Sequence, residues 1–433
     1  MKNYLLIIFD CLNTNLTKLG AIFNSPKISA LSWRISIIRH NLKIKKNKKN
    51  ILLLYRAVAI EDFSHFNRKD KKKISVFIFP RLHIKKIFNV FFKKLNHTID
   101  DNNYITKDPK IEQTKILYRN FLKNTLKILN RYYKFSSIVS FNFKYYAERE
   151  LHFAASENRI KFIVLHKESL FFPGQAVALK KMFTSYGKFG GDHILTYNRN
   201  FKELILSTKI ASAKQVTSIG MPRADYYHKV RKAKKKYFLI MVITEGTGTQ
   251  YIKKKNKFTR QKNIKIDNKI YTWKKLSKLT IKNVLEFARK NPNIDFIFKT
   301  KGPIYDLKKI GLDVIFKDNS LNNCTIANKE NTGSLIKDAK AVIGFNTTTL
   351  AEAMILNKTI IIPEFGIKNK FLLNNFTLKL GNCVHHAKNE NQFISLMKKV
   401  INNKINNATC SKIDKRKYIN TYIGNPDGLS TRR

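Results

Sequence analysis

The chain has 433 residues, which is too long for one ordinary hydrophobic core, and its 43% hydrophobic content excludes an intrinsically disordered protein. It carries 84 lysine and arginine residues against 29 aspartate and glutamate residues, a formal net charge of +55. No apolar run approaches the roughly 20 residues that span a bilayer, which predicts a cytoplasmic protein, at most peripheral to the inner face of the membrane.

The large positive charge has two interpretations. It could hold the protein on anionic lipid or on another acidic polymer. Alternatively, it follows from a composition crowded with Lys, Asn, Ile and Phe, the residues that an AT-rich genome over-supplies. We favour the second interpretation because the lysines are scattered and arginine is sparse, whereas nucleic-acid-binding proteins concentrate these residues on one face or helix. We therefore expect no nucleic-acid partner, while a peripheral contact with an anionic membrane stays open.

The first part of the chain predicts one Rossmann-like domain over residues 51–230, after an N-terminal extension of unassigned fold over 1–50. Within the extension, 31–38 predicts a short amphipathic helix and 41–50 a solvated basic linker. Strands are then predicted at 51–55, 74–79, 136–141, 161–165, 193–197 and 215–219, with helices at 110–133, 145–158 and 200–206. This alternation is typical of a parallel sheet with crossover helices.

The second part repeats the pattern over residues 237–433. Strands are predicted at 237–244, 295–299, 314–316, 341–345 and 359–362, and helices at 276–290, 350–355 and 393–402, with an exposed basic insertion at 252–266. The fold class is therefore α/β, with two Rossmann-like domains facing a central cleft. Four widely spaced cysteines without a CxxC pair predict ordinary thiols of a reducing compartment and no metal site: Cys11, Cys324, Cys383 and Cys410.

The stretch 334–366 predicts a strand, a turn, a helix and a second strand of a parallel sheet. Open α/β sheets bind ligands at such turns, where strands end at their carboxyl ends. Small and hydroxyl-bearing residues fill this turn and suit a phosphate or diphosphate: Gly344, Asn346, Thr347, Thr348 and Thr349. Glu352 has two interpretations, because it fits a capping box with Thr349 as well as a ligand-binding role.

Other polar residues follow predicted strands and are further candidates. His166 and Glu168 follow the strand 161–165, and either could act as a general base toward a hydroxyl acceptor. Lys299 and Lys301 follow the strand 295–299 and could pair with a phosphate. Thr244 and Gly246 open the segment TEGTGT, which resembles a phosphate-cradling loop but lacks the Walker pattern. Each group could also be an ordinary surface loop or turn.

The segment GFNTTTLAEAMILNKTIIIPEFG resembles the C-terminal-domain motif of glycosyltransferases with the two-Rossmann-domain (GT-B) architecture. More narrowly, the chain is similar to bacterial surface-carbohydrate and capsule biosynthesis proteins, and distantly to the CDP-glycerol glycerophosphotransferases. Three further stretches carry this resemblance over roughly residues 130–433: VLHKES, IGMPRADYY and GNPDGLSTRR. The glycerophosphotransferases tend to carry His-Gly and His-Pro where this chain has His166-Lys167 and Lys301-Gly302, which favours sugar transfer over glycerol-phosphate transfer.

The resemblance implies a role for each matched position. Gly344 and the three threonines would surround the donor's diphosphate, and Glu352 would lie near its ribose or sugar. His166 or Glu168 would face the acceptor, and Arg223 and Asp225 would lie near the hinge. The implied metal-independent enzyme moves a sugar from a nucleotide-linked donor to a surface polysaccharide or lipid-linked glycan, with no cofactor beyond the nucleotide-sugar co-substrate. The alternatives are a UDP-sugar 2-epimerase of the same fold and a non-catalytic basic protein that binds glycan or membrane.

Overall fold

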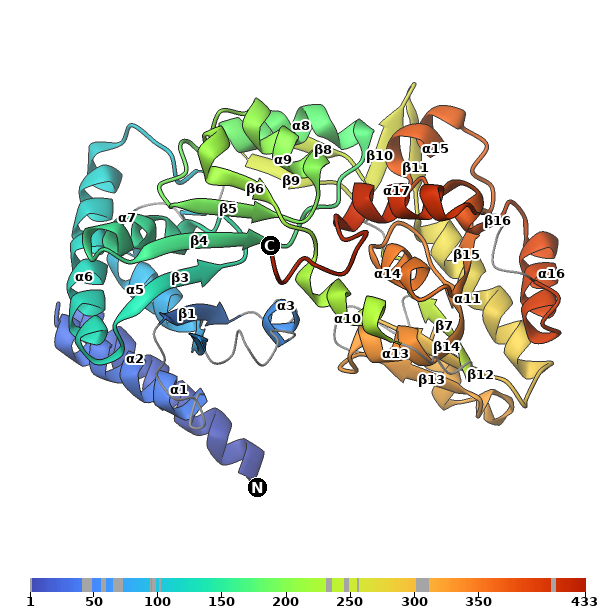
Figure 1. Ribbon diagram of the computed structural model, residues 1–433, viewed down its shortest axis with the longest axis horizontal. Helices are drawn as coiled ribbons and strands as arrows, with labels where there is room; N and C mark the ends of the chain where they lie inside the picture. Colours follow the sequence, from blue (N-terminus) through green and yellow to red (C-terminus); the bar gives the residue numbers. More distant parts are fainter. Residues whose placement is uncertain are drawn as a thin grey trace. The chain divides into compact units, whose positions relative to one another are not determined.

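The computed structural model describes residues 2–40, 49–55, 60–64, 73–93, 95, 99–100, 103–230, 236–244, 249–254, 257–300, 311–405 and 410–433. The described chain divides into two compact units. Unit 1 contains the described residues up to 169 and those of 180–219, and unit 2 contains 170–179 and most of the chain from 220 onward. Each unit is built on a six-stranded parallel sheet (Figure 1), which confirms the predicted α/β class with two Rossmann-like parts.

The sheet of unit 1 has the strand order β2-β1-β3-β4-β5-β6. Its strands are β1 (Lys49–Tyr55), β2 (Ile74–Pro80), β3 (Phe135–Ser140), β4 (Lys161–His166), β5 (His193–Thr196) and β6 (Val216–Ser218). Leu52, Leu53 and Leu54 are buried on both faces of β1, which explains the continuous apolar run in the sequence. The order reverses between β1 and β3, so the switch point of this sheet lies there.

Helices cover the sheet of unit 1 (Figure 1). They are α1 (Lys2–Ile22), α2 (Pro26–His40), α3 (Glu61–Ser64), α5 (Leu82–Phe92), α6 (Pro109–Tyr133), α7 (Arg149–Glu157) and α9 (Arg199–Ser207), while α8 (Pro173–Thr184) crosses the division at 179–180. The long helix α6 begins where the Asp108 side chain accepts hydrogen bonds from the first free N–H groups, and Pro109 follows it. The sequence analysis assigned no fold to the extension 1–50. The described part of this extension contains the helices α1 and α2.

The sheet of unit 2 has the order β13-β12-β7-β14-β15-β16. Its strands are β7 (Tyr237–Met241), β12 (Asp295–Lys299), β13 (Cys324–Ala327), β14 (Ala339–Ile343), β15 (Thr359–Pro363) and β16 (His385–Ala387). Counted within the unit, this is the 3-2-1-4-5-6 order of the Rossmann fold. The helices are α10 (Asp225–Lys229), α11 (Lys274–Arg289), α13 (Thr332–Asp338), α14 (Thr349–Ile355), α15 (Lys370–Phe376), α16 (Glu390–Ile401) and α17 (Lys412–Ile423). The switch point lies between β7 and β14.

Unit 2 contains strands that the sequence analysis did not predict. In and beside the predicted exposed insertion 252–266, β8 (Tyr251–Lys254) pairs with β9 (Lys257–Arg260), and β10 (Asn263–Ile266) pairs with β11 (Lys269–Thr272). Residues 314–316 form a 3₁₀ helix, and the edge strand is β13 instead. An apolar run of three residues is too short for periodicity to separate strand from helix, and β13 itself carries only a weak apolar pattern.

Two of the four cysteines also depart from the expectation of ordinary thiols. The structure joins Cys383 and Cys410 in a disulfide, with their Cα atoms 4.6 Å apart. Cys11 and Cys324 are free. Within the described residues, no helix is both long enough and apolar enough to cross a bilayer.

Candidate functional site

The candidate donor residues of unit 2 gather at the carboxyl ends of its strands. Thr244 follows β7, Lys299 ends β12, and the threonine turn follows β14. Because β7 and β14 are neighbours at the switch point, the loops after them flank the crevice where open α/β sheets bind ligands. Lys301 and Gly246 lie outside the described residues.

Asn346 fixes the shape of the turn after β14. Its φ of 50° is left-handed, a conformation that asparagine tolerates better than most residues. The side-chain nitrogen Nδ2 donates to the Phe376 carbonyl at 2.8 Å, and Oδ1 accepts from the Leu378 N–H at 2.9 Å. Both ends of the side-chain amide therefore bind the backbone at the end of α15 and just after it. In this way Asn346 positions the loop that carries the threonines.

The three threonines of the turn differ in what their hydroxyl groups can do. Thr347 donates from Oγ1 to Thr349 Oγ1 at 3.2 Å and accepts from the Thr349 N–H at 3.4 Å. Thr348 is the N-cap residue of α14, yet its side chain makes no capping hydrogen bond, and it is half-buried. The Thr348 hydroxyl is therefore the one of the three that is best placed to meet a ligand.

Gly344 lets α14 lie close to β7. A Cβ atom at this position would lie 3.1 Å from both Leu350 Cδ2 and Met241 Cβ. Any larger residue would push the start of α14 away from the strand. Gly344 therefore acts on the site through packing, and the turn keeps its place at the edge of the sheet.

Glu352 is a buried carboxylate with two partners from another segment. Its side chain is only 4% exposed. Tyr227 donates from its hydroxyl to Oε2 at 2.7 Å, and Arg223 Nη2 lies 3.5 Å from Oε1. The N-cap of α14 is Thr348 and carries no side-chain cap, so the capping box that the sequence allows for Thr349 and Glu352 is not formed. Tyr227 and Arg223 therefore hold the Glu352 side chain in place on the helix that follows the threonine turn.

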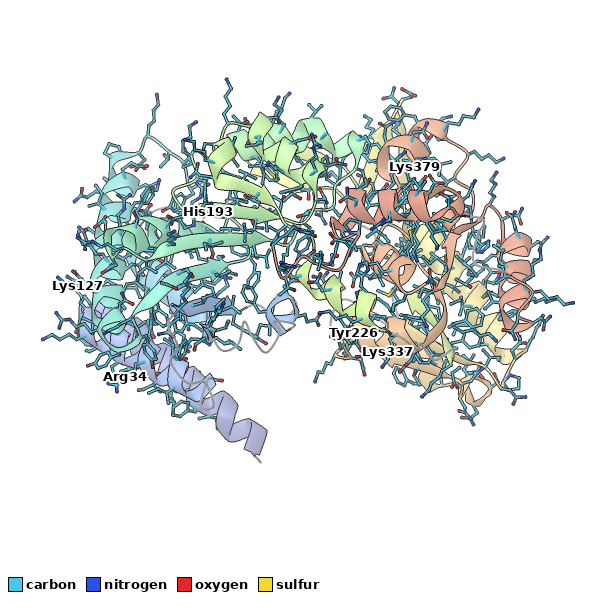
Figure 2. The ribbon with its side chains drawn as sticks, in the orientation of Figure 1. Arg34, Lys127, His193, Tyr226, Lys337 and Lys379 are labelled. Atoms are coloured by element: carbon cyan, nitrogen blue, oxygen red, sulfur yellow. A yellow bond between two sulfur atoms is a disulfide. The ribbon has the colours of Figure 1, made fainter. Side chains whose placement is uncertain are left out.

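The turn that carries Arg223 and Tyr227 is itself held by the C-terminal segment. Asp225 is buried and accepts from Asn425 Nδ2 at 2.7 Å, from the Ser430 N–H at 2.9 Å and from the Thr431 N–H at 2.8 Å. Asn425 Nδ2 also donates to the Met221 carbonyl at 2.9 Å. Tyr226, labelled in Figure 2, precedes Tyr227 on α10. The two sequence stretches IGMPRADYY and GNPDGLSTRR thus form one structure, in which Asp225 is the anchor.

Lys299 lies against backbone carbonyl groups at the same edge of the sheet. Its ammonium donates to the Asn328 carbonyl at 2.8 Å and to the Thr300 carbonyl at 3.4 Å, and the residue is buried. These hydrogen bonds place the Lys299 ammonium group near the carboxyl ends of β12 and β13. The charge can act on an anion nearby even though the donors already have partners.

The two candidate bases of unit 1 have different surroundings. His166 is 2% exposed, and its ring stacks on Phe201 at 4.7 Å and lies 5.0 Å from Phe143. This burial lowers the pKa of His166 to about 3, and the Glu168 carboxylate opposes the shift only in part. Glu168 is exposed and accepts from Asn142 Nδ2 at 3.2 Å. Of the pair, Glu168 is the one that a substrate can reach.

A cavity of about 530 Å³ lies beside the switch point of unit 1. It is lined by Tyr55 at the end of β1, by residues that follow β2, and by the segment after β3, including Arg81, Lys85, Tyr145 and Tyr146. Arg81 donates to the Glu148 carboxylate, and its guanidinium lies 3.7 Å from the centre of the Tyr145 ring. The sequence analysis missed these residues. The available signal was a basic residue directly after Pro80, which closes a predicted strand.

A second cavity, of about 390 Å³, lies in unit 2 near the carboxyl ends of β15 and β16. Tyr271, Trp273 and Gly366 are among its lining residues. The Trp273 ring contacts Phe345 edge to face at 4.9 Å, and Phe345 precedes the threonine turn directly. The turn and this cavity are therefore neighbours. Among the described residues, no group of three or more His, Cys, Asp or Glu side chains could hold a metal ion.

No family model matches the chain, and no curated protein sequence matches it. Solved structures with a similar fold include a UDP-N-acetylglucosamine 2-epimerase at 12% identity and a TM-score of 0.48, with 90% of this chain and 94% of that chain covered. The Neisseria meningitidis UDP-GlcNAc 2-epimerase bound to UDP-GlcNAc has 12% identity, a TM-score of 0.45 and coverage of 88% and 97%. The wall teichoic acid polymerase TagF has 9% identity, a TM-score of 0.47 and coverage of 98% and 96%. None of them assigns a role to a residue of this chain.

Proposed function

We propose that the chain is a glycosyltransferase that moves a sugar from a nucleotide-linked donor to a surface polysaccharide or lipid-linked glycan in the cytoplasm. The observation that carries this proposal is the threonine turn with its half-buried Thr348, which leads into a helix that carries the buried Glu352 carboxylate, at the switch point of a Rossmann-ordered sheet. The sequence resemblance to GT-B glycosyltransferases supports the same assignment.

In this proposal the donor binds unit 2. The Thr348 hydroxyl donates to the diphosphate, and the positive charge of Lys299 stabilises the negative charge that develops on the leaving group. The Glu352 carboxylate accepts hydrogen bonds from hydroxyl groups of the ribose or sugar, while Tyr227 and Arg223 keep it oriented. The cavity beside Trp273 offers an apolar wall for the nucleotide base.

The acceptor binds unit 1 in this proposal, and Glu168 is the general base. An exposed carboxylate can reach an acceptor hydroxyl, whereas His166 is buried and its lowered pKa makes it a weak base. The cavity lined by Arg81, Lys85 and tyrosine rings suits a sugar that carries phosphate. This cavity in unit 1 favours transfer over epimerisation, since an epimerase needs no acceptor.

The test is a thermal-shift screen of nucleotide sugars, followed by product analysis by mass spectrometry with and without a lipid-linked or oligosaccharide acceptor. We expect stabilisation by at least one nucleotide sugar, and product that appears only when an acceptor is present. An epimerised sugar nucleotide formed without acceptor would identify a 2-epimerase instead. If no nucleotide sugar stabilises the chain, the result would support the alternative of a non-catalytic protein that binds glycan or membrane. Loss of turnover with retained donor binding in Glu168→Gln would support the role of Glu168.

A further inference from the structure

The N-terminal helices α1 and α2 pack against each other through polar side chains. Thr17 Oγ1 lies 2.7 Å from Ser32 Oγ, and Ser32 Oγ donates to the Asn13 carbonyl at 2.6 Å. His83 of α5 closes the network, with Nδ1 2.6 Å from Thr17 Oγ1 and Nε2 2.8 Å from Ser36 Oγ. All of these side chains are buried. We call this network the polar seam; it holds the helix pair together by hydrogen bonds.

The helices approach closely along the polar seam. A Cβ atom on Gly20 would lie 2.4 Å from Ser29 Oγ and 2.7 Å from the Ser29 backbone nitrogen, so no larger residue fits. Small residues with hydrogen bonds between helices are typical of helix pairs that lipid surrounds, because apolar side chains then gain nothing by facing each other. In water-soluble proteins, the apolar face of a helix is the one that turns inward.

The outward face of α1 is apolar. Six large apolar side chains are exposed on and just after this helix, Phe9 among them, and five share one side at helical spacing: Ile8, Leu12, Leu19, Ile22 and Phe23. Leu12 is 64% exposed and Phe23 is 70% exposed. We call this set the apolar face. By helical spacing it lies away from the polar seam, so α1 has the reverse of the pattern expected for a helix on a water-soluble domain.

Lys18, which precedes Leu19 of the apolar face on α1, belongs to a group of basic side chains. A cavity of about 590 Å³ is lined by Lys18 of α1 and by Lys86 and Lys93 of α5 and its end, with apolar walls from Phe88, Phe92 and Leu95. The sequences of α1, α2 and α5 contain one acidic residue, Asp10. We call the three lysines the lysine cluster. An apolar surface with lysines at its side is complementary to a lipid bilayer with anionic headgroups.

We propose that the apolar face and the lysine cluster dock unit 1 on an anionic membrane, with α1 lying in the plane of the interface. The helix inserts its apolar side chains among the acyl chains, and the lysines bind headgroup phosphates. A second copy of the chain fits less well, because two lysine clusters would repel each other. The proposal is independent of the transferase activity.

The experiment measures flotation of the full chain with phosphatidylcholine vesicles and with vesicles in which a third of the lipid is phosphatidylglycerol. We expect binding to the anionic vesicles that weakens with salt. Two triple variants remove one part of the surface each: Leu12→Gln/Leu19→Gln/Phe23→Gln and Lys18→Gln/Lys86→Gln/Lys93→Gln. The first should lower vesicle affinity by more than about ten-fold. The second should lower it about five-fold per lysine.

Matched controls change the same residue types on unit 2. They are Ile270→Gln/Phe316→Gln/Ile413→Gln, at positions that are also exposed, and Lys290→Gln/Lys398→Gln/Lys412→Gln. We expect both controls to bind as the parent chain does. Equal losses in the two lysine triples, with no loss in the Leu12 triple, would show attraction by net charge alone and overturn the proposal. Absence of vesicle binding, together with a dimer in light scattering that the Leu12 triple dissociates, would assign the face to a second copy and also overturn it.

Discussion

The Tyr227 hydroxyl donates to the Glu352 carboxylate at 2.7 Å across 125 positions of sequence. The turn that carries Tyr227 is fixed in turn by Asp225, which binds the backbone of the C-terminal segment. Three segments far apart in the chain therefore determine the position of one buried carboxylate. Because this carboxylate lies beside the threonine turn, substitutions in any of the three segments should reach the donor site.

Glu352→Gln should weaken binding of the nucleotide-sugar donor about ten-fold or more, since it replaces a charged acceptor of hydrogen bonds by a neutral amide. Isothermal titration with the nucleotide sugar found in the thermal-shift screen measures the loss. Tyr227→Phe removes a hydrogen bond of about 1–2 kcal/mol that orients the carboxylate but leaves the carboxylate in place, so it should lower donor affinity less than Glu352→Gln does. A donor affinity in Glu352→Gln equal to that of the parent chain would leave Glu352 a structural role only.

Thr348→Val should lower donor affinity several-fold and leave the free energy of unfolding nearly unchanged, because its hydroxyl makes no capping bond in the described structure. Thr347→Val separates ligand binding from folding, since the Thr347 hydroxyl bonds within the turn. It should cost about 1 kcal/mol of unfolding free energy. Urea unfolding and donor titration of both variants give the comparison. If neither Glu352→Gln nor Thr348→Val changes donor affinity, the turn is ordinary α/β packing.

Asn425→Ala should destabilise unit 2 by about 3 kcal/mol, because it leaves the Asp225 carboxylate, the Met221 carbonyl and the Gly428 N–H each without one partner. The control is Asn420→Ala on the exposed side of α17, where we expect no loss. Chemical denaturation measures both. Donor affinity should also fall in Asn425→Ala, because the turn that carries Arg223 and Tyr227 loosens. Unchanged donor affinity in this variant would contradict a link between that turn and the donor site.

The stability of unit 1 should fall as the pH drops below about 6.5, the usual pKa of histidine. Burial lowers the pKa of His152, with help from the Arg149 charge, and that of His166 to about 3 each. The unfolded chain therefore binds protons between pH about 6.5 and 3 that the folded chain does not bind. Each histidine should cost about 1.4 kcal/mol of unfolding free energy per pH unit in this window.

The measurement is the pH dependence of urea unfolding for the parent chain, His152→Leu and His166→Leu. Each variant should show a shallower dependence than the parent by the contribution of one histidine. Comparing slopes removes the contribution of carboxylates that titrate in the same range. Identical slopes in all three proteins would show that these histidines titrate normally in the folded state.

The sequence predicted those parts of the fold in which local pattern and tertiary environment agree. The strand β1 and the helix α6 were found almost to their ends, because one is apolar throughout and the other has a regular apolar stripe with a cap at Asp108. The threonine turn was found for the same reason, since it lies between an apolar strand and a helix.

The parts that the sequence did not predict depend on distant partners. Glu352 matched a capping box locally, but Tyr227 and Arg223 bind it from another segment, and no local pattern shows this. Arg81 becomes part of a cavity only when β1, β2 and the segment after β3 lie side by side. The helix α1 was not predicted because its buried face is polar, so the usual apolar stripe points outward.

The polar seam between α1 and α2 reverses the usual guide to which substitutions a helix tolerates. Thr17→Val is conservative by shape and raises hydrophobicity at a buried position, yet it removes the partner that lies 2.6 Å from His83 Nδ1. Leu12→Gln places a polar group at an exposed position and should leave the fold intact. A ranking of variants by burial and hydrophobicity would therefore accept the first as harmless to folding, while the second would pass every assay performed without lipid.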